Sequence, residues 1–145
     1  MKKICLFSVI FILIDRVIKI LVQSFLTSKG IYLIDHFFYV TYVKNDGAAF
    51  SILEGKQVLL VILGILASIL IVYYVKKSNS KNIGYSLLLG GIIGNVIDRM
   101  VFGFVIDYLG FIIFNKVMPI FNFADMLIVF GAILILFDNK TNKKE

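Results

Sequence analysis

Three carboxylates and several other polar side chains interrupt otherwise apolar sequence in the last third of the chain. They stand in Gly90–Arg99 (GGIIGNVIDR), Val105–Leu109 (VIDYL) and Phe121–Asp125 (FNFAD). Ionisable groups inside a bilayer cost from a few to ~10 kcal/mol or more, so they are rarely there without a role. We therefore expect Asp107 and Asp125 to form a pair of catalytic carboxylates at one membrane face.

Such a pair has a definite chemistry. Two carboxylates that share a desolvated site cannot both ionise easily, so together they hold one proton. One of them can activate water while the other polarises a carbonyl group and then protonates the leaving amine. The spacing does not say which aspartate is the base and which is the acid.

The rest of the composition favours carboxylate chemistry. The chain has one cysteine, Cys5, and one histidine, His36, which exclude an intramolecular disulfide and any metal site built from several cysteines or histidines. We expect no metal and no cofactor. His36 is expected to be an interfacial polar residue, and no serine nucleophile with a histidine base is evident.

The overall composition is that of a membrane protein. Of 145 residues, 60% are hydrophobic and 17% are charged, which suits a single integral-membrane domain (residues 1–145) and excludes a soluble globular one. The formal net charge is +6, and lysines flank the apolar runs: Lys2, Lys3, Lys76, Lys77, Lys81, Lys140, Lys143 and Lys144. This pattern predicts an even number of spans with both termini in the cytoplasm. Lysines spread over helix ends disfavour a nucleic-acid partner.

We predict an all-α membrane protein with four transmembrane helices and a small β-rich element on the extracytoplasmic surface. The expected spans are residues 4–26, 57–75, 83–102 and 120–137. Residues 58–75 hold no charged side chain and would form a helix of ~27 Å, about the thickness of the hydrocarbon core. Runs rich in β-branched and aromatic residues predict strands at 31–33, 37–43 and 104–109.

Charged residues within the first span are expected to be paired. Asp15 and Lys19 are four apart, so they share a helix face and are expected to form an ion pair. The pair could be a self-paired cluster near the outer half of the helix, or it could face the bundle interior and support the site. For a pair that faces the interior, we favour a supporting role over a catalytic one.

The third span combines small and polar residues. Small residues recur every four positions, at Ser86, Gly90 and Gly94, which lets helices approach closely. Asn95 and Asp98 extend this small and polar stripe, and Arg99 borders it. The simpler alternative is helix packing plus an Asp98–Arg99 pair at the helix end, which explains the glycines well but Asn95 poorly.

The start of the fourth span also has two explanations. Asn122 followed by Asp125 resembles a helix N-cap with an acidic residue near the positive end of the helix dipole. Capping alone would account for both residues if Asp107 did not precede them.

The sequence resembles the lipoprotein signal peptidases (signal peptidase II), a family of bacterial membrane aspartyl peptidases, over essentially its whole length. Five blocks match in order: Asp15 with Lys19, KNDGAAFS (44–51), GGIIGNVIDR (90–99), VIDY (105–108) and PIFNFAD (119–125). One departure is Met126, where the family usually carries a small polar residue.

The resemblance implies roles for individual residues. Asp107 and Asp125 would be the catalytic dyad. Four residues would line the site or hold the substrate backbone: Asn45, Asn95, Arg99 and Asn122. Asp15 and Asp98 would support the fold, and we add Lys19 and the turn residue Gly47 as structural residues.

The resemblance also implies a substrate and a location. The substrate would be a prolipoprotein whose lipobox cysteine bears a diacylglyceryl group, cleaved just before that cysteine. The enzyme would be a multi-pass protein of the bacterial cytoplasmic membrane, in contact with its lipids, with the site near the extracytoplasmic face. We expect it to be a monomer. The surface element around residues 45–50 could clamp the substrate.

Two other classes compete with this interpretation. A small transporter or proton-conducting helical bundle would carry acids throughout the membrane depth, whereas Asp98, Asp107 and Asp125 are expected to cluster at one face. A structural or assembly protein would leave Asp107 and Asp125 without a purpose.

Overall fold

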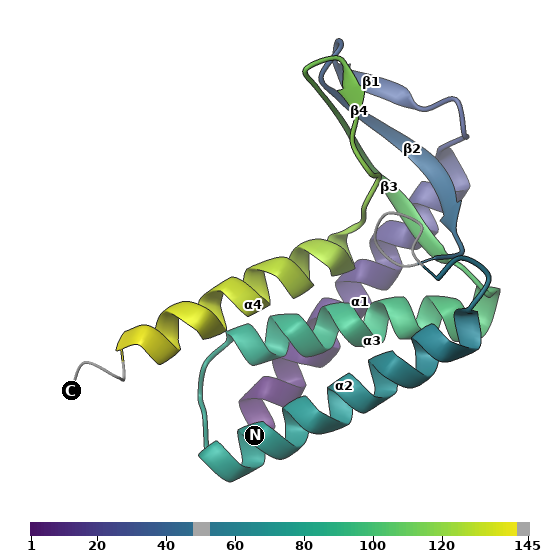
Figure 1. The fold of residues 1–145 in the computed structure, drawn as a ribbon. Helices are drawn as coiled ribbons and strands as arrows, with labels where there is room; N and C mark the ends of the chain where they lie inside the picture. Colours follow the sequence, from purple (N-terminus) through teal and green to yellow (C-terminus); the bar gives the residue numbers. More distant parts are fainter. Residues whose placement is uncertain (48–52, 142–145) are drawn as a thin grey trace.

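The computed structural model describes residues 1–47 and 53–141. Within these ranges it contains four helices and a four-stranded sheet (Figure 1). The elements in chain order are α1 (Lys2–Phe25), β1 (Ile31–Ile34), β2 (Phe38–Asn45), α2 (Gln57–Ser78), α3 (Gly84–Phe102), β3 (Val105–Ile113), β4 (Lys116–Val117) and α4 (Phe123–Thr141). Figure 1 shows the sheet extending from the end of the helices at which α3 finishes and α4 begins.

Helix α3 lies at the centre of the bundle and packs against α1, α2 and α4. Its glycines make these contacts close. A Cβ atom at Gly90 would lie 2.8 Å from Cβ of Phe11 in α1, and one at Gly91 would collide with the carbonyl oxygen of Ala124 in α4. The prediction that small residues allow close helix approach is confirmed on this helix.

In its middle part, helix α1 turns charged side chains toward the bundle and apolar side chains outward. Asp15 and Lys19 are buried, with 1% and 0% of their surface exposed. Leu6, Leu13 and Val17, by contrast, are each more than half exposed. This is the reverse of a helix on a water-soluble protein, whose apolar face turns toward the core.

The sheet is antiparallel with the order β1-β2-β3-β4. Three of its strands were predicted, whereas the two-residue strand β4 was not. The register of β2 against β3 pairs Val43 with Asp107 and Asn45 with Val105. The sheet therefore brings the turn after β2 beside the first half of β3.

Most helix boundaries differ from prediction, by one to four residues. The helix expected at 120–137 begins at Phe123, because Phe121 continues the extended chain and exchanges backbone hydrogen bonds with Leu109 of β3 at 2.8 and 3.1 Å. This pairing leaves Asn122 directly before α4, where its side chain caps the helix. Helix α2 runs on to Ser78, three residues beyond the predicted end, and stops at Asn79 in a left-handed conformation.

Among the described helices, α2 and α3 are long and apolar enough to cross a membrane. Helix α2 is the more exposed of the two, with Val58 and Leu70 at 75% and 66%. The protein is thus helix-rich, with a small antiparallel sheet and two candidate membrane-spanning helices. The prediction of four spans stays a prediction at this point, since α1 and α4 carry several charges.

Candidate active site

Asp107 of β3 and Asp125 of α4 line one cavity of about 620 Å³. Asp107 is buried, with 2% of its surface exposed, and Asp125 is partly buried. Asn45, Asn95 and Arg99 also line this cavity, with further walls from Val43, Lys44, Asp46, Glu54, Val105, Pro119, Ile120, Phe121, Ile128 and Val129. Five residues of the predicted site, far apart in the sequence, thus line one cavity, whereas the sixth, Asn122, is buried behind it and contacts Asp107.

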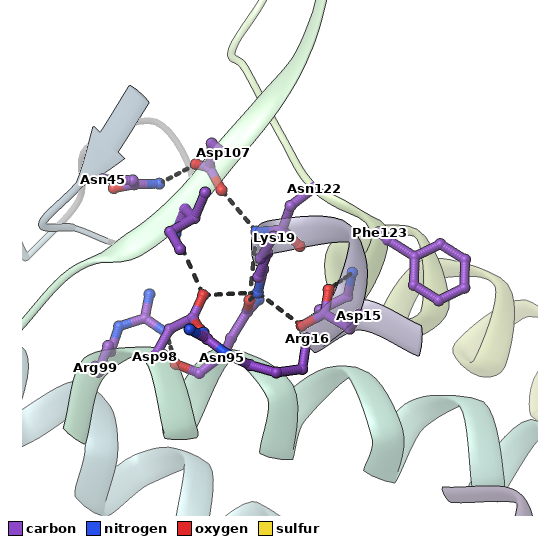
Figure 2. Close-up of polar contacts among 12 residues, drawn as sticks. Asp15, Arg16, Lys19, Asn45, Asn95, Asp98, Arg99, Asp107, Asn122 and Phe123 are labelled. Atoms are coloured by element: carbon purple, nitrogen blue, oxygen red, sulfur yellow. Dashed lines mark hydrogen bonds and ion pairs between the residues drawn. The ribbon is translucent and has the colours of Figure 1, made fainter. Parts of the chain in front are cut away.

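Both oxygens of the Asp107 carboxylate accept hydrogen bonds from asparagine amides (Figure 2). The side chain of Asn122 donates to Oδ1 at 2.6 Å, and that of Asn45 donates to Oδ2 at 2.7 Å. The backbone N–H of Gly47 in turn donates to the side-chain oxygen of Asn45 at 2.9 Å, which fixes the orientation of that amide. Asp107 is therefore held in place from two elements.

Asp125 is held in a similar way. The side-chain amide of Asn95 donates to Oδ1 at 2.8 Å, and the backbone N–H of Asn122 donates to Oδ2 at 3.2 Å. Asn122 also accepts the Asp125 backbone N–H on its side-chain oxygen at 2.9 Å, which completes a reciprocal helix cap. Capping and the contact with Asp107 use different atoms of Asn122, so the two explanations offered for this residue are compatible.

The electrostatic environment favours a proton on Asp107. Burial is the largest influence and raises its pKa from 3.8 to about 6, and the negative charge of Asp125 acts in the same direction. Hydrogen bonds from Asn45 and Asn122 and the charge of Lys19 partly oppose the rise. Asp107 can therefore exchange a proton close to neutral pH.

Lys19 lies beneath the two aspartates and is fully buried. Its ammonium group is 2.8 Å from Oδ2 of Asp15, 2.8 Å from Oδ2 of Asp98 and 2.9 Å from the side-chain oxygen of Asn95 (Figure 2). The predicted Asp15–Lys19 ion pair is confirmed, and it faces the interior of the bundle.

The alternative prediction, an ion pair between Asp98 and Arg99, is wrong. Asp98 binds Lys19 and Arg16 of α1, with Nη1 of Arg16 at 2.9 Å, and accepts the backbone N–H of Ile106 at 3.3 Å. Arg99 instead donates from Nη2 to the carbonyl oxygen of Gly47 at 2.8 Å. Adjacent residues on a helix point about 100° apart, so Asp98 turns toward α1 while Arg99 turns toward the turn after β2.

Asp15 accepts a backbone hydrogen bond from the N-terminus of α4. A helix begins with backbone N–H groups that have no partner within the helix. Ala124 donates to Oδ1 of Asp15 at 3.1 Å, and Phe123 donates to the hydroxyl oxygen of Tyr108 at 3.0 Å. Asp15 and Tyr108 thereby fix the start of the helix that carries Asp125.

Sequence reasoning missed Tyr108 and Arg16. Tyr108 follows Asp107 in the VIDY block, and Arg16 follows Asp15, so each is adjacent to a predicted residue. The signal that could have identified Tyr108 is the need of α4 for acceptors at its first turn.

Two further sequence predictions concern residues 45–50 and Met126. The proposed clamp at residues 45–50 is described only as far as Gly47, and its remainder lies outside the described residues. Met126 lines a second, apolar cavity of about 370 Å³ beside Asp125, together with Phe121, Val129 and Phe130.

Helices with exposed apolar faces and a buried polar site at one end define the class of a membrane enzyme. Residues 7–140 match the family model of signal peptidase (SPase) II. The chain belongs to the signal peptidase II family.

Individual relatives cover nearly the whole chain. The lipoprotein signal peptidase of Halothermothrix orenii is 41% identical over 131 residues, 88% of this chain and 88% of the relative. That of Staphylococcus aureus is 36% identical over 148 residues, 97% of this chain and 91% of the relative. A solved structure described as a bacterial membrane enzyme matches with a TM-score of 0.86 at 35% identity, covering 100% of this chain and 93% of the other.

Family membership settles the general activity. The protein is a membrane peptidase that removes signal peptides from prolipoproteins. The alternative of a transporter or proton-conducting bundle receives no support from these relatives.

Proposed function

We propose that this protein is an aspartic endopeptidase that cleaves diacylglyceryl-modified prolipoproteins just before the lipid-modified cysteine, with Asp107 and Asp125 as its catalytic pair. The observation that carries the proposal is the convergence of these two carboxylates, from β3 and α4, on one cavity. Amide donors hold both carboxylates, and the raised pKa of Asp107 suits a pair that shares one proton.

With one proton shared between Asp107 and Asp125, one aspartate is ionised and the other is protonated, and the two would have different roles in the reaction. The ionised aspartate takes a proton from water as the water oxygen attacks the carbonyl carbon of the scissile peptide bond. The protonated aspartate donates a hydrogen bond to the carbonyl oxygen and stabilises the tetrahedral intermediate. Proton transfer to the amide nitrogen then breaks the C–N bond and releases the new amino terminus. Either aspartate can take either part.

The neighbouring polar residues would bind the substrate backbone. Asn45, Asn95, Arg99 and Asn122 all lie within one hydrogen bond of an aspartate or line the cavity. Nε of Arg99 is buried and has no hydrogen-bond acceptor among the described residues, so it can donate to a peptide carbonyl. Asp15, Lys19, Gly47 and Asp98 would hold these residues in position.

We further propose that all four helices span the membrane as one domain and one monomer. The inverted polarity of α1 favours a lipid environment for its outer face, and α4 likewise exposes Val129, Phe130, Leu136 and Phe137. The lysines at residues 2, 3, 76, 77 and 81 would place both termini in the cytoplasm of a bacterial cell, with the aspartates near the outer face of its cytoplasmic membrane.

The sheet would lie on the lipid surface beside the site. Strand β1 and the turn after it expose Ile31, Tyr32, Leu33, Ile34 and Phe37. A peptide bond next to a membrane-anchored cysteine would be held at this same depth, so the lipid itself would help to position the substrate.

The test is cleavage by the purified full-length protein in lipid bilayers. We expect a diacylglyceryl-modified prolipoprotein to yield a product whose first residue is the modified cysteine, identified by mass spectrometry. The same precursor without the lipid serves as the control and should be cleaved far more slowly. Equal cleavage of both precursors, or cleavage at another bond, would contradict the proposed substrate.

A further inference from the structure

The geometry points to Lys19 as a positioning residue of the catalytic site, whose ammonium group fixes the side-chain amide of Asn95 so that it donates to Asp125. This inference rests on the proposed aspartic mechanism and adds a role beyond structural support. It concerns a residue that does not line the cavity, so Lys19 acts through Asn95 and not on the substrate.

Lys19 uses all its donors. An ammonium group has three N–H donors and no acceptor. The three partners of Lys19 are Asp15, Asp98 and Asn95, at 2.8, 2.8 and 2.9 Å. Charge neutralisation explains the two carboxylates. The third bond is directed at a neutral amide of the candidate site, which charge neutralisation does not require.

This third bond sets the orientation of the amide. Only the oxygen of the Asn95 amide can face an ammonium group, so its nitrogen must point the opposite way, toward Asp125 at 2.8 Å. Asn122 also donates to the Asn95 oxygen, at 3.3 Å. A rotated amide would set its N–H₂ group against these donors and its oxygen against the Asp125 carboxylate. The bond between Asn95 and Asp125 therefore depends on Lys19.

The charges around Lys19 allow its effect to be isolated. Two buried carboxylates, Asp15 and Asp98, face two cations of α1, Lys19 and Arg16, so this cluster is balanced without the dyad. Asp107 is surrounded by Asp125 of α4, Lys19 of α1 and Arg99 of α3. Removing the charge of Lys19 should raise the pKa of Asp107, since that charge holds it down.

The experiment uses the paired variant Lys19→Met/Asp15→Asn in the full chain. Lys19→Met alone would leave two buried carboxylates with one fewer cation and is expected to unfold the protein. The pair removes one positive and one negative charge together, and the amide introduced at position 15 keeps an oxygen acceptor for the backbone N–H of Ala124. We expect a folded protein with KM within about threefold and kcat reduced about 100-fold. In the dependence of kcat on pH, the limb that reflects the ionisation of Asp107 should move to higher pH.

Three controls separate positioning from structure. Asp15→Asn alone gives the cost of the lost carboxylate, and the paired variant should lose far more kcat than it. Arg16→Met removes the other cation of the cluster without touching Asn95. The Arg16 side chain is 29% exposed and its ion-pair partner is Asp98, which keeps Lys19 as a partner, so this variant should fold with a lower Tm while kcat stays within about threefold. In an Asn95→Ala background, the paired substitution should change kcat little further, because Lys19 acts through that amide.

A second measurement uses the folded wild type. The side-chain amide nitrogen resonance of Asn95 should shift as the dyad titrates, and an unresponsive resonance would overturn the inference. Wild-type kcat and an unshifted pH limb in the paired variant would overturn it as well. That result is distinct from a failure of the proposed function, which active Asp107→Asn or Asp125→Asn variants would reveal.

Discussion

The side-chain nitrogen of Asn122 lies 2.6 Å from a carboxylate oxygen of Asp107, although 15 positions separate the two residues. The same side chain caps α4 through its oxygen, which accepts the backbone N–H of Asp125 at 2.9 Å. One asparagine thus joins a helix start to a strand and links the two candidate catalytic carboxylates. The effects of these two hydrogen bonds, one to Asp107 and one from the Asp125 backbone, can be measured separately by substitution.

Asn122→Ser should separate stability from activity. Serine keeps an oxygen that can cap the Asp125 N–H, so the free energy of unfolding should fall only by about 1–2 kcal/mol, the contribution of the lost buried hydrogen bond to Asp107. It loses the N–H₂ donor to Asp107, so kcat should fall by about 100-fold. Asn122→Ala loses both bonds and should cost a further ~1 kcal/mol of stability. Thermal unfolding and cleavage kinetics measure the two effects, and full activity of the serine variant would contradict this assignment.

The raised pKa of Asp107 predicts a pH-dependent stability. A carboxyl group with a folded-state pKa of about 6, against 3.8 ordinarily, binds its proton more tightly in the folded state. Stability is therefore full below about pH 4 and is lost as pH rises through about 6, by ~3 kcal/mol in total. Asp107→Asn should remove this loss. Denaturant unfolding of both proteins between pH 4 and 7.5 tests it, with the exposed Asp35→Asn as a control that should behave as wild type.

Neighbouring glycines of α3 should differ in their effect on activity. A methyl group at Gly91 meets the carbonyl oxygen of Ala124, the residue before Asp125, whereas one at Gly90 meets Phe11 of α1 at 2.8 Å. Both alanine variants should lose about 1–3 kcal/mol of stability through overpacking. Only Gly91→Ala should also lower kcat per folded molecule, because it displaces the first turn of α4. Equal kcat in the two variants would contradict a site that depends on the close contact of α3 and α4.

Thiol labelling tests the proposed membrane topology. The exposed Cys5 is first replaced by serine, and single cysteines are then placed at Asn115, in the turn before β4, and at Ser78, the end of α2. A membrane-impermeant thiol reagent added to intact cells should label Asn115→Cys. Ser78→Cys should react only after permeabilisation. Labelling of both positions from outside would exclude the proposed arrangement.

Contacts within one helix could be predicted from the sequence. The Asp15–Lys19 pair follows from the four-residue spacing alone, and the strands follow from β-branched and aromatic runs. Contacts between helices could not, because they depend on how each helix is rotated. The sequence suggested an ion pair between Asp98 and its neighbour Arg99 as one alternative, yet the partners of Asp98 are Arg16 and Lys19 of α1.

The start of α4 was misplaced for a related reason. Apolar residues 120 and 121 look helical in sequence, but Phe121 pairs with Leu109 of β3, a contact that no local pattern reveals. The role of Tyr108 was missed because it depends on this same placement. The polar residues that meet at the cavity could be selected from the sequence, since polar groups stand out in apolar sequence, and their roles in the reaction stay predictions.

Replacing each aspartate by asparagine tests the central claim most directly. Asp107→Asn and Asp125→Asn preserve shape, so both variants should insert, fold and bind the lipid-modified prolipoprotein with near wild-type affinity. Their kcat should fall by about 10³-fold or more, because neither variant can hold the shared proton between two carboxylates. Near-normal cleavage by either variant would contradict the aspartate dyad and turn attention to the buried carboxylate of Asp98.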